Sequence, residues 1–385
     1  MNNLMMEEIK AQASLFDRCA TELIAAAKLI VKNHIKPSVN RVYITGCGDS
    51  YFAGMACKEA FLRLASLRCE AHQAMEFSRY VCPLELDENA VVFSISSSGK
   101  VARTQEAAIN AKARGAVSIA VTANADTPLA KLADAVFCVD IPNSIALAPG
   151  TRSYAASQLA LICLAIALGE ERGTLSPAAA SDLLNTLSLL GSAVEKTVDE
   201  LTPMISAYVD FYLSPDKPNA VRAFHLLGSG PNLATAHFGS MKLLESCAFP
   251  SIPTGIEEWA HSQFFITDAN THVLFIAPHG ASRTRALEVM RAVSVADGKS
   301  LVICEADDEQ LRAAADIAFP IYGMKNIPEW LSHLVYAVPL EILSMLMGQR
   351  LNRQSFDFVK RPWIKEENFR QIYRSQILTL EDIQP

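Results

Sequence analysis

Two short turns rich in glycine and serine are the residues of this chain best placed to do chemistry. Gly46–Tyr51 (Gly-Cys-Gly-Asp-Ser-Tyr) follows one apolar run, and Ser96–Lys100 (Ser-Ser-Ser-Gly-Lys) follows another about fifty residues later. Each turn also opens a helical pattern, and hydroxyls beside helix-N-terminal N–H groups are preorganised donors for an anion. Two such turns indicate a phosphorylated small molecule, with a sugar phosphate as the expected ligand. The predicted phosphate donors are Ser50, Ser96 and Ser98, although serines also occur at such positions as ordinary helix N-caps.

The turns need a rigid sheet to hold them, and the sequence predicts one. Continuous apolar runs separated by helical patterns are typical of a parallel sheet buried on both faces. The first forty residues are helical instead, with Leu15, Cys19, Leu23 and Ala27 on one face. The expected strands are Val42–Thr45, Ala90–Ile95, Val117–Thr122 and Ala135–Val139, and the expected helices are Ser50–Ser66, Arg103–Arg114 and Ser153–Leu168.

The same pattern returns about 180 residues later, after a block without strand signals. In that block Gly, Ser and Pro residues bracket two expected helices, Ala180–Leu190 and Val194–Phe211. The returning segments indicate a duplication, and they are Ala223–Asn232, Val273–Pro278, the helix Thr284–Ala296 and Ser300–Cys304. The repeats differ where a ligand would bind, because Pro278–Ala281 lacks the stacked hydroxyls of the first repeat. Only the first repeat is expected to hold phosphate.

The predicted fold class is α/β, with two duplicated, doubly wound parallel-sheet subdomains of the flavodoxin-like type. With 385 residues, half of them apolar, the chain can bury two substantial cores. The expected organisation is N-terminal helices at residues 1–40, a phosphate-binding domain at 41–170, a helical connection at 171–220, a second α/β domain at 221–350 and a C-terminal tail at 351–385.

Composition and charge narrow the class of protein. The formal net charge of −7 argues against nucleic acid or an anionic membrane as the main partner. Nine scattered cysteines without a Cys-x-x-Cys pair indicate reduced thiols. No signal peptide is expected, and the longest apolar stretch, Leu159–Leu168, is too short to span a bilayer. We therefore expect a soluble cytoplasmic protein.

A duplicated α/β unit with these two turns resembles the double-SIS-domain sugar isomerase family. Within it, the chain is similar to the isomerase half of glucosamine-6-phosphate synthase and to fructosamine-6-phosphate deglycases, over residues 40 to 360. Gly46–Tyr51 matches the family's Cys-Gly-Thr-Ser-Tyr turn, with Asp49 in place of the threonine. Ser96–Val101 matches Ser-Gln-Ser-Gly-Glu-Thr, with Val101 in place of a phosphate-binding threonine, and Ala148–Arg152 stands where the family has a Val-Ala-Ser-Thr-Lys substrate loop. The resemblance implies these substrate- and phosphate-binding residues: Gly48, Asp49, Ser50, Ser96, Ser97, Ser98, Val101 and Thr151.

The second repeat carries the residues to which the resemblance assigns catalysis. Gly239–Glu245 resembles the helix Gly-Ala-Leu-Lys-Leu-Lys-Glu, whose last residue is the family's catalytic carboxylate. Glu258–His261 matches Glu-Leu-Lys-His, whose histidine opens the sugar ring and comes from the neighbouring subunit of a homodimer. Asp357–Lys360 resembles Asn-Leu-Ala-Lys, whose lysine can form a Schiff base, and Lys365 is a rival for that role. The predicted catalytic residues are Glu245, His261, Lys242 and Lys360.

Each of these roles has a chemical reason and a plainer alternative. A carboxylate near C1 and C2 of a sugar phosphate can move a proton between them, whereas Glu245 could simply be a solvated helix end paired with Lys242. Lys242 could also bind a developing enolate oxygen. An imidazole suits ring opening near neutral pH, whereas His261 could be a satisfied core histidine. Lys360 needs a dry pocket to form an imine and could instead lie in a basic surface tail.

No metal and no cofactor are expected. Glu258 and His261 form one Glu-x-x-His step, but a di-metal bundle needs two, and the sequence has no second. The expected partners are a small-molecule sugar phosphate and a second copy of the chain, in a homodimer or higher oligomer with a shared active site. Since the chain begins Met1-Asn2-Asn3 and leads directly into the isomerase-like region, ammonia from a glutaminase domain is not expected.

The expected function is conversion of a 6-phosphorylated ketose or ketosamine by aldose–ketose chemistry, through an enediolate or enamine. Two outcomes stay open: isomerisation, with or without amino transfer, and deglycation to glucose 6-phosphate plus an amine. Lys242 favours the first, and Ile266–Thr271, which resembles the deglycases, favours the second. An alternative of another class is a non-catalytic sugar-phosphate sensor, although the first forty residues do not resemble a DNA-binding helix-turn-helix module.

Overall fold

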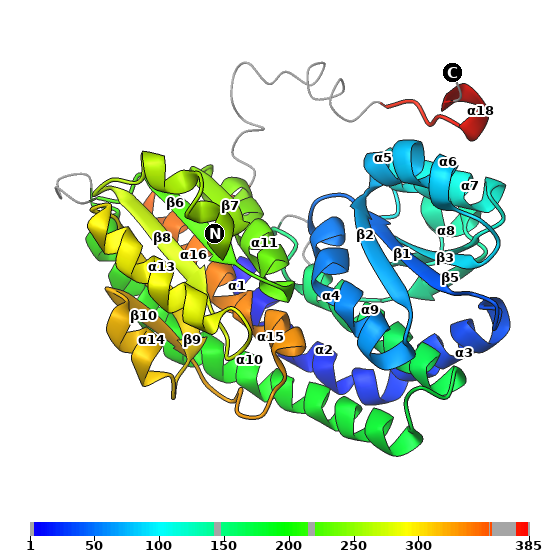
Figure 1. Ribbon diagram of the computed structural model, residues 1–385, viewed down its shortest axis with the longest axis horizontal. Helices are drawn as coiled ribbons and strands as arrows, with labels where there is room; N and C mark the ends of the chain where they lie inside the picture. The colour runs from blue at the N-terminus through cyan, green and yellow to red at the C-terminus, as the bar shows by residue number, and fades with distance from the viewer. Residues whose placement is uncertain (1–3, 142–147, 215–219, 354, 356–374, 384–385) are drawn as a thin grey trace. The chain divides into compact units, whose positions relative to one another are not determined.

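The computed structural model describes residues 4–141, 148–214, 220–353, 355 and 375–383. The chain divides into two compact units, which Figure 1 shows coloured along the sequence. The first unit comprises Ser14–Ser144, Arg152–Ser188 and Pro362–Pro385. The second unit comprises Met1–Ala13, Ile145–Thr151 and Leu189–Arg361.

The first unit is built on a five-stranded, all-parallel sheet with the order β2-β1-β3-β4-β5. Its strands are β1 (Arg41–Gly46), β2 (Arg68–Gln73), β3 (Ala90–Ile95), β4 (Val117–Thr122) and β5 (Ala135–Cys138). Every residue of β3 is buried, as expected for a central strand covered on both faces. Thr45 of β1 lies opposite Ser94 of β3, so these two strands end side by side.

Helices cover both faces of this sheet. They are α2 (Ala13–Asp17), η1 (Cys19–Leu23), α3 (Ile24–His34), α4 (Asp49–Ala65), α5 (Ala74–Glu76), η2 (Phe77–Val81), α6 (Cys82–Glu85), α7 (Ala102–Ala113), α8 (Pro128–Leu132), α9 (Arg152–Glu171) and α18 (Leu380–Ile383). The helix α9 is apolar on almost every side and packs against α3 and α4. A helix that is apolar all round is typical of a protein core.

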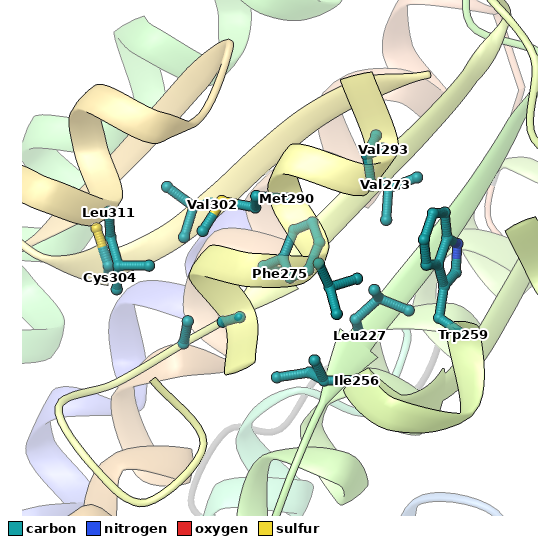
Figure 2. Packing of buried hydrophobic residues seen from close by; sticks show 13 residues of the cluster. Leu227, Ile256, Trp259, Val273, Phe275, Met290, Val293, Val302, Cys304 and Leu311 are labelled. Carbon is teal, nitrogen blue, oxygen red and sulfur yellow. The ribbon is translucent and has the colours of Figure 1, made fainter. Parts of the chain in front are cut away.

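The second unit repeats the same sheet, with the parallel order β10-β9-β8-β6-β7. Its strands are β6 (Ala223–Gly228), β7 (Ser251–Gly255), β8 (Thr271–Ile276), β9 (Lys299–Glu305) and β10 (Ile317–Ile321). Its helices are α1 (Leu4–Ala11), α11 (Pro231–Cys247), α12 (Ile256–Trp259), η3 (Gln263–Ile266), α13 (Arg283–Val295), α14 (Glu309–Ala314), α15 (Glu329–Tyr336) and α16 (Val338–Arg350). Figure 2 shows one core of this unit, where side chains of β6, β8 and β9 meet those of α12 and α13. The predicted fold of two similar α/β subdomains is confirmed.

One long helix replaces two predicted helices. We expected separate helices at Ala180–Leu190 and Val194–Phe211, but α10 runs without a break from Pro177 to Tyr212, through Pro203. A stripe of buried apolar residues continues at helical spacing across the expected gap, and it contains Leu187, Leu190, Val194, Val198, Leu201 and Ile205. A helix-interior glycine costs only about 1 kcal/mol, so the burial of this stripe outweighs the glycine and serine that suggested a break.

Three strands were not predicted: β2, β7 and β10. All three lie at sheet edges, where strands are short and partly exposed. Pro253 in β7 and Pro320 in β10 also weaken the strand pattern, because proline cannot donate to a ladder. These three strands therefore lack the continuous apolar run that identified β1, β3, β4 and β5.

Two segments of the described chain are long and apolar enough to cross a membrane, Arg152–Glu171 and Glu329–Arg350. The apolar windows of these segments are 89% and 94% buried inside the protein. This burial is that of core helices, so neither segment is evidence for a membrane span.

Candidate functional site

The two serine-containing turns lie at the switch point of the first sheet. β1 lies between β2 and β3, so the chain reverses its direction of progress across the sheet at the pair β1/β3. Ligands of open α/β sheets bind in the crevice at the carboxyl ends of the strands at such a point. Gly46–Ser50 follows β1 and Ser96–Gly99 follows β3, so both turns occupy this place.

Glycine is required where the two turns meet. A Cβ atom on Gly46 would lie 2.7 Å from Cβ of Ser50, closer than real contacts allow, and 3.1 Å from the carbonyl oxygen of Ile95, which is tighter than most real contacts. The first turn and the end of β3 therefore approach each other at backbone distance.

The first turn ends in an uncapped helix. Gly48 is the N-cap of α4, has a φ of 55° and provides no side-chain cap. Asp49 and Ser50 are the first two residues of α4. The first N–H groups of a helix lack intrahelical acceptors and carry the positive end of its dipole. This helix start suits an anion, and phosphate binding by Gly48, Asp49 and Ser50 stays a prediction.

The second turn contains a buried hydroxyl without a hydrogen-bond partner in the described part of the chain. Ser96 is only 3% exposed, and its Oγ has no hydrogen-bond partner among the residues that the structure describes. Burying a hydroxyl without a partner costs about 1–3 kcal/mol. A ligand oxygen at this point would remove that cost, so Ser96 is the strongest single indication of a binding site in the first unit.

The rest of the second turn is held rigidly. The carbonyl of Ser97 accepts hydrogen bonds from the Ala123 amide and the Thr122 hydroxyl, both 3.1 Å long. The hydroxyl of Ser98 accepts from the amide of Lys100 at 3.3 Å. Val101 is the N-cap of α7 and gives it no side-chain cap. A second uncapped helix therefore begins at this switch point.

The predicted loop residue Thr151 lies immediately before α9. It is fully buried, and its Oγ1 has no hydrogen-bond partner in the described part of the chain. It belongs to the second unit, whereas the two turns belong to the first. Its membership of the same site stays a prediction.

The predicted pair Lys242 and Glu245 forms on α11. Nζ of Lys242 lies 2.5 Å from Oε2 of Glu245 and 5.0 Å from the centre of the Phe238 ring. The Lys242 side chain is fully buried, whereas 24% of the Glu245 side chain is exposed. The pairing that the plainer alternative expected is therefore present, with a partly exposed Glu245 and a buried lysine. A buried ammonium held against a partly exposed carboxylate is an arrangement that can stabilise negative charge on a bound molecule.

His261 lies on the surface, just after α12. Its side chain is 67% exposed, and its Nε2 lies 3.2 Å from Oε1 of Glu257. Glu257 is also paired with Arg285 at 2.6 Å, and this hydrogen bond, together with His261, lowers the pKa of the Glu257 carboxyl. The alternative of a core histidine is wrong, because the buried residue in this segment is Trp259.

A buried hydrogen bond fixes the segment that carries His261. Nε1 of Trp259 donates to Nδ1 of His225 on β6 at 3.0 Å. Burial lowers the pKa of His225 to about 4, so its imidazole is neutral near pH 7 and can accept this hydrogen bond. Trp259 lies at the edge of the core cluster in Figure 2. His225 had no predicted role, and its apolar strand offered no signal for one.

A charged network beside the second turn was also missed. Glu106 and Arg103 on α7 pair with each other, and Glu106 also bonds Arg79 at 2.9 Å. The Glu106 side chain has no exposed surface. A glutamate within an alanine-rich helix was the only sequence signal. No group of three or more metal-ligating side chains occurs within the described ranges. Lys360 and Lys365 lie outside the described residues.

The fold and these turns define a class: α/β proteins with paired flavodoxin-like sheets and a serine turn at one switch point. Residues 37–167 match the SIS domain family, so the sheet of the first unit belongs to a SIS domain. The expected resemblance to double-SIS-domain sugar isomerases is confirmed.

Known proteins resemble this chain over most of its length. The chain is 26% identical over 351 residues to a glutamine–fructose-6-phosphate aminotransferase (isomerizing) of Clostridium tetani, covering 89% of this chain and 55% of that protein. It resembles the C-terminal domain of glucosamine-fructose-6-phosphate aminotransferase from Francisella tularensis with a TM-score of 0.79 and 20% identity, over 91% of this chain and 97% of that one. It resembles tagatose-6-phosphate ketose/aldose isomerase from Escherichia coli with a TM-score of 0.76 and 16% identity, over 94% and 97%. The chain spans about half the length of the curated relatives it matches.

Proposed function

We propose that this protein converts a 6-phosphorylated ketose or ketosamine by aldose–ketose chemistry. The observation that carries the proposal is the buried, unpartnered Ser96 hydroxyl at a switch point where two uncapped helices begin. Such a place suits a phosphate monoester, which brings several acceptor oxygens and two negative charges. The relatives of Clostridium tetani and Escherichia coli, which are named for fructose 6-phosphate and tagatose 6-phosphate, support a sugar phosphate.

Phosphate binding is assigned to the first unit. The donors are the hydroxyls of Ser50, Ser96 and Ser98 and the first N–H groups of α4 and α7. Val101 has no hydroxyl group to donate to the phosphate. The backbone of α7 therefore contributes more of the phosphate binding than in relatives with threonine at this position. Thr151 stays a candidate for the substrate loop.

Proton transfer is assigned to the Lys242–Glu245 pair. Glu245 removes the proton from one of the two carbons C1 and C2 and returns it to the other, so one carboxylate serves both steps. As the proton leaves, negative charge develops on the adjacent oxygen, and the buried ammonium of Lys242 stabilises it. His261 is exposed and can exchange protons with solvent, which suits the opening of a cyclic sugar. Lys360 is the candidate for an imine with the open-chain sugar.

The burial of Lys242 against Glu245 supports isomerisation over deglycation, because a buried ammonium suits the negative charge of an enediolate. We further propose a cytoplasmic homodimer or higher oligomer in which the exposed His261 serves the neighbouring subunit. Deglycation and sugar-phosphate sensing are outcomes that the following experiment distinguishes.

A ³¹P and ¹H NMR time course with a small panel tests the proposal. The panel contains fructose 6-phosphate with and without ammonium, glucosamine 6-phosphate and two fructosyl-amino-acid 6-phosphates. Interconversion among the first three supports the proposed isomerase chemistry. Release of glucose 6-phosphate and amino acid only from the last two identifies a deglycase. Line broadening without turnover identifies a sensor and overturns the catalytic proposal. Glu245→Gln is the matched control, since it keeps the shape of the side chain and removes the base.

A further inference from the structure

The C-terminal segment 375–383 is bound to the first unit through a buried carboxylate. Glu106 on α7 accepts from the amide of Leu378 at 2.7 Å, from the hydroxyl of Ser78 at 2.8 Å, and from the guanidinium groups of Arg79 and Arg103. Burial by itself raises the pKa of Glu106, but these hydrogen bonds and charges lower it below its usual value. Glu106 therefore stays ionised and offers a strong acceptor to the segment.

The segment is recognised mainly through its backbone. Besides the Leu378 amide, the carbonyl of Leu378 accepts from Nδ2 of Asn110 at 3.2 Å, and the carbonyl of Gln376 accepts from Nη2 of Arg103. Leu380 adds an apolar contact with the core cluster around Tyr43. We call Gln376, Leu378 and Leu380 with these partners the C-terminal clamp. Contacts at every second residue are those of an extended chain.

The clamp reaches the phosphate site through Arg103. This residue lies in the first turn of α7, two positions after Val101. Burial raises the pKa of the Cys47 thiol in the first turn, and the Ala74 backbone, the Thr104 hydroxyl and the charge of Arg103 act against that rise. The first turn also meets the end of β3 at backbone distance, and α7 begins a few residues after β3, so Arg103 and its neighbour Thr104 lie near the turn that holds Gly48.

Two of the three donor nitrogens of Arg103 are engaged by the clamp. Nη1 bonds Glu106 and Nη2 bonds the Gln376 carbonyl, and the side chain is only 13% exposed. Its Nε is buried and has no hydrogen-bond partner among the described residues. A guanidinium held at two nitrogens is fixed in orientation, so its third donor and its charge have a defined direction.

We propose that the C-terminal clamp is a positioning element of the phosphosugar site: it holds the Arg103 guanidinium beside the first turn, where its charge and its Nε–H meet the phosphate group. This inference rests on the proposed function, because it concerns the same phosphate site. It adds a cation to a site whose other donors are neutral hydroxyls and amides. It also makes phosphosugar binding depend on a segment far from the turns in sequence.

A double-mutant cycle tests the coupling. Leu378→Pro removes the N–H that donates to Glu106, and Ile377→Pro is the matched control that keeps it. We expect Leu378→Pro and Arg103→Gln each to weaken binding of fructose 6-phosphate about tenfold in calorimetric titrations, the usual loss for a hydrogen bond to a charged group. Leu378→Pro should add nothing in the Arg103→Gln background, because the segment acts through Arg103. Ile377→Pro should bind like the unmodified protein.

Each other result has a distinct meaning. Equal binding by Leu378→Pro and the unmodified protein overturns the positioning role and leaves the proposed function intact. Additive losses in the double variant also overturn it, since the segment then acts only on the fold. Failure of the unmodified protein to bind fructose 6-phosphate or any other phosphosugar of the NMR panel overturns the proposed function and this inference together.

Amide hydrogen exchange on the unmodified protein gives a second test that needs no variant. Because binding couplings are reciprocal, a clamp that favours phosphosugar binding is itself stabilised by the bound sugar. Fructose 6-phosphate should therefore slow exchange in peptides that contain Leu378, whereas fructose should not. Unchanged exchange at saturating fructose 6-phosphate overturns the proposal even if Leu378→Pro fails to fold.

Discussion

The switch points of the two sheets have nearly the same backbone shape, but their polar groups have different partners. Gly48 and Gly230 are the N-caps of α4 and α11, with φ of 55° and 56°, so the first turns of the two units have nearly the same shape. In the second unit, however, Pro231 removes one helix-start N–H, and Asn232 is bonded to Ser332 at 2.7 Å. Side chains of the same unit thus provide the hydrogen-bond partner for this turn.

The second turns differ even more. In the second unit the amide of His279 donates to Glu305 at 2.9 Å, and the amide of Ala281 donates to Glu329 at 3.0 Å. A Cβ on Gly280 would lie 2.1 Å from the Glu329 carboxyl group, so the carboxylate occupies the space next to the turn. In the first unit, the hydroxyl of Ser96 in the corresponding turn bonds to none of the residues that the structure describes. The second unit thus fills this position with its own carboxylates, whereas the first unit leaves it for a ligand.

The two units should differ most in their roles in catalysis. We expect the second unit to control the chemical step without binding phosphate. Glu245→Gln should lower kcat by about a hundredfold or more, the usual contribution of a general base. KM and the affinity for fructose 6-phosphate should stay nearly unchanged. Steady-state kinetics and calorimetry on the active substrate check this. Unchanged kcat would exclude Glu245 as the base.

Acid should lower the stability of the second unit through His225. The first unit has a tyrosine at the equivalent position, and this residue does not titrate at acid pH. His225 and Tyr43 occupy the same place, third in β6 and β1. The pKa of His225 falls from its usual value near 6.5 to about 4, so the unfolded chain binds more protons between these values. Stability therefore rises with pH across this window and is lost as pH falls from 6.5 to 4, by about 3 kcal/mol.

His225→Gln removes this titration while keeping an acceptor for Trp259. Urea unfolding followed by tryptophan fluorescence should show a flatter pH dependence for this variant between pH 4 and 6.5. The carboxylates that titrate in both proteins cancel in the comparison. An identical pH slope in the variant and the unmodified protein would exclude His225 as the source.

Ser96→Ala tests the open turn. Loss of a hydrogen bond to a charged ligand should weaken phosphosugar binding by about 1.5–3 kcal/mol. The free energy of unfolding without ligand should stay equal or increase, because the variant removes a buried hydroxyl that has no partner. Calorimetric titration and urea unfolding measure the two effects. A loss of stability with unchanged binding would mean that the hydroxyl is structural.

Asn232→Ala is the opposite test in the closed turn and has the smallest expected effect. It breaks the hydrogen bond to Ser332, so stability should fall by about 1 kcal/mol or somewhat more. Binding of fructose 6-phosphate should not change. Weaker binding in this variant would show that the second unit also takes part in phosphate recognition.

Much of the fold could be predicted from the sequence because the signals are local. The central strands β3 and β4 have continuous apolar runs, and their predicted bounds are confirmed at Ala90–Ile95 and Val117–Thr122. The turn at Gly46–Ser50 was recognisable because its backbone admits only glycine at close approach. The edge strands β2, β7 and β10 and the continuity of α10 were not predictable, because they depend on neighbouring strands and on a buried stripe rather than on local residue preference.

The sequence by itself determined the two α/β units, the serine turns and the spacing of Lys242 and Glu245, since periodicity and helix spacing act over a few residues. Only the tertiary structure decided that Lys242 is buried, that His261 is exposed and that Glu329 fills the second turn. It alone brought Leu378 to Glu106, which lies 272 residues away in the chain. Burial and long-range hydrogen bonds depend on which surfaces meet, and no local pattern specifies that.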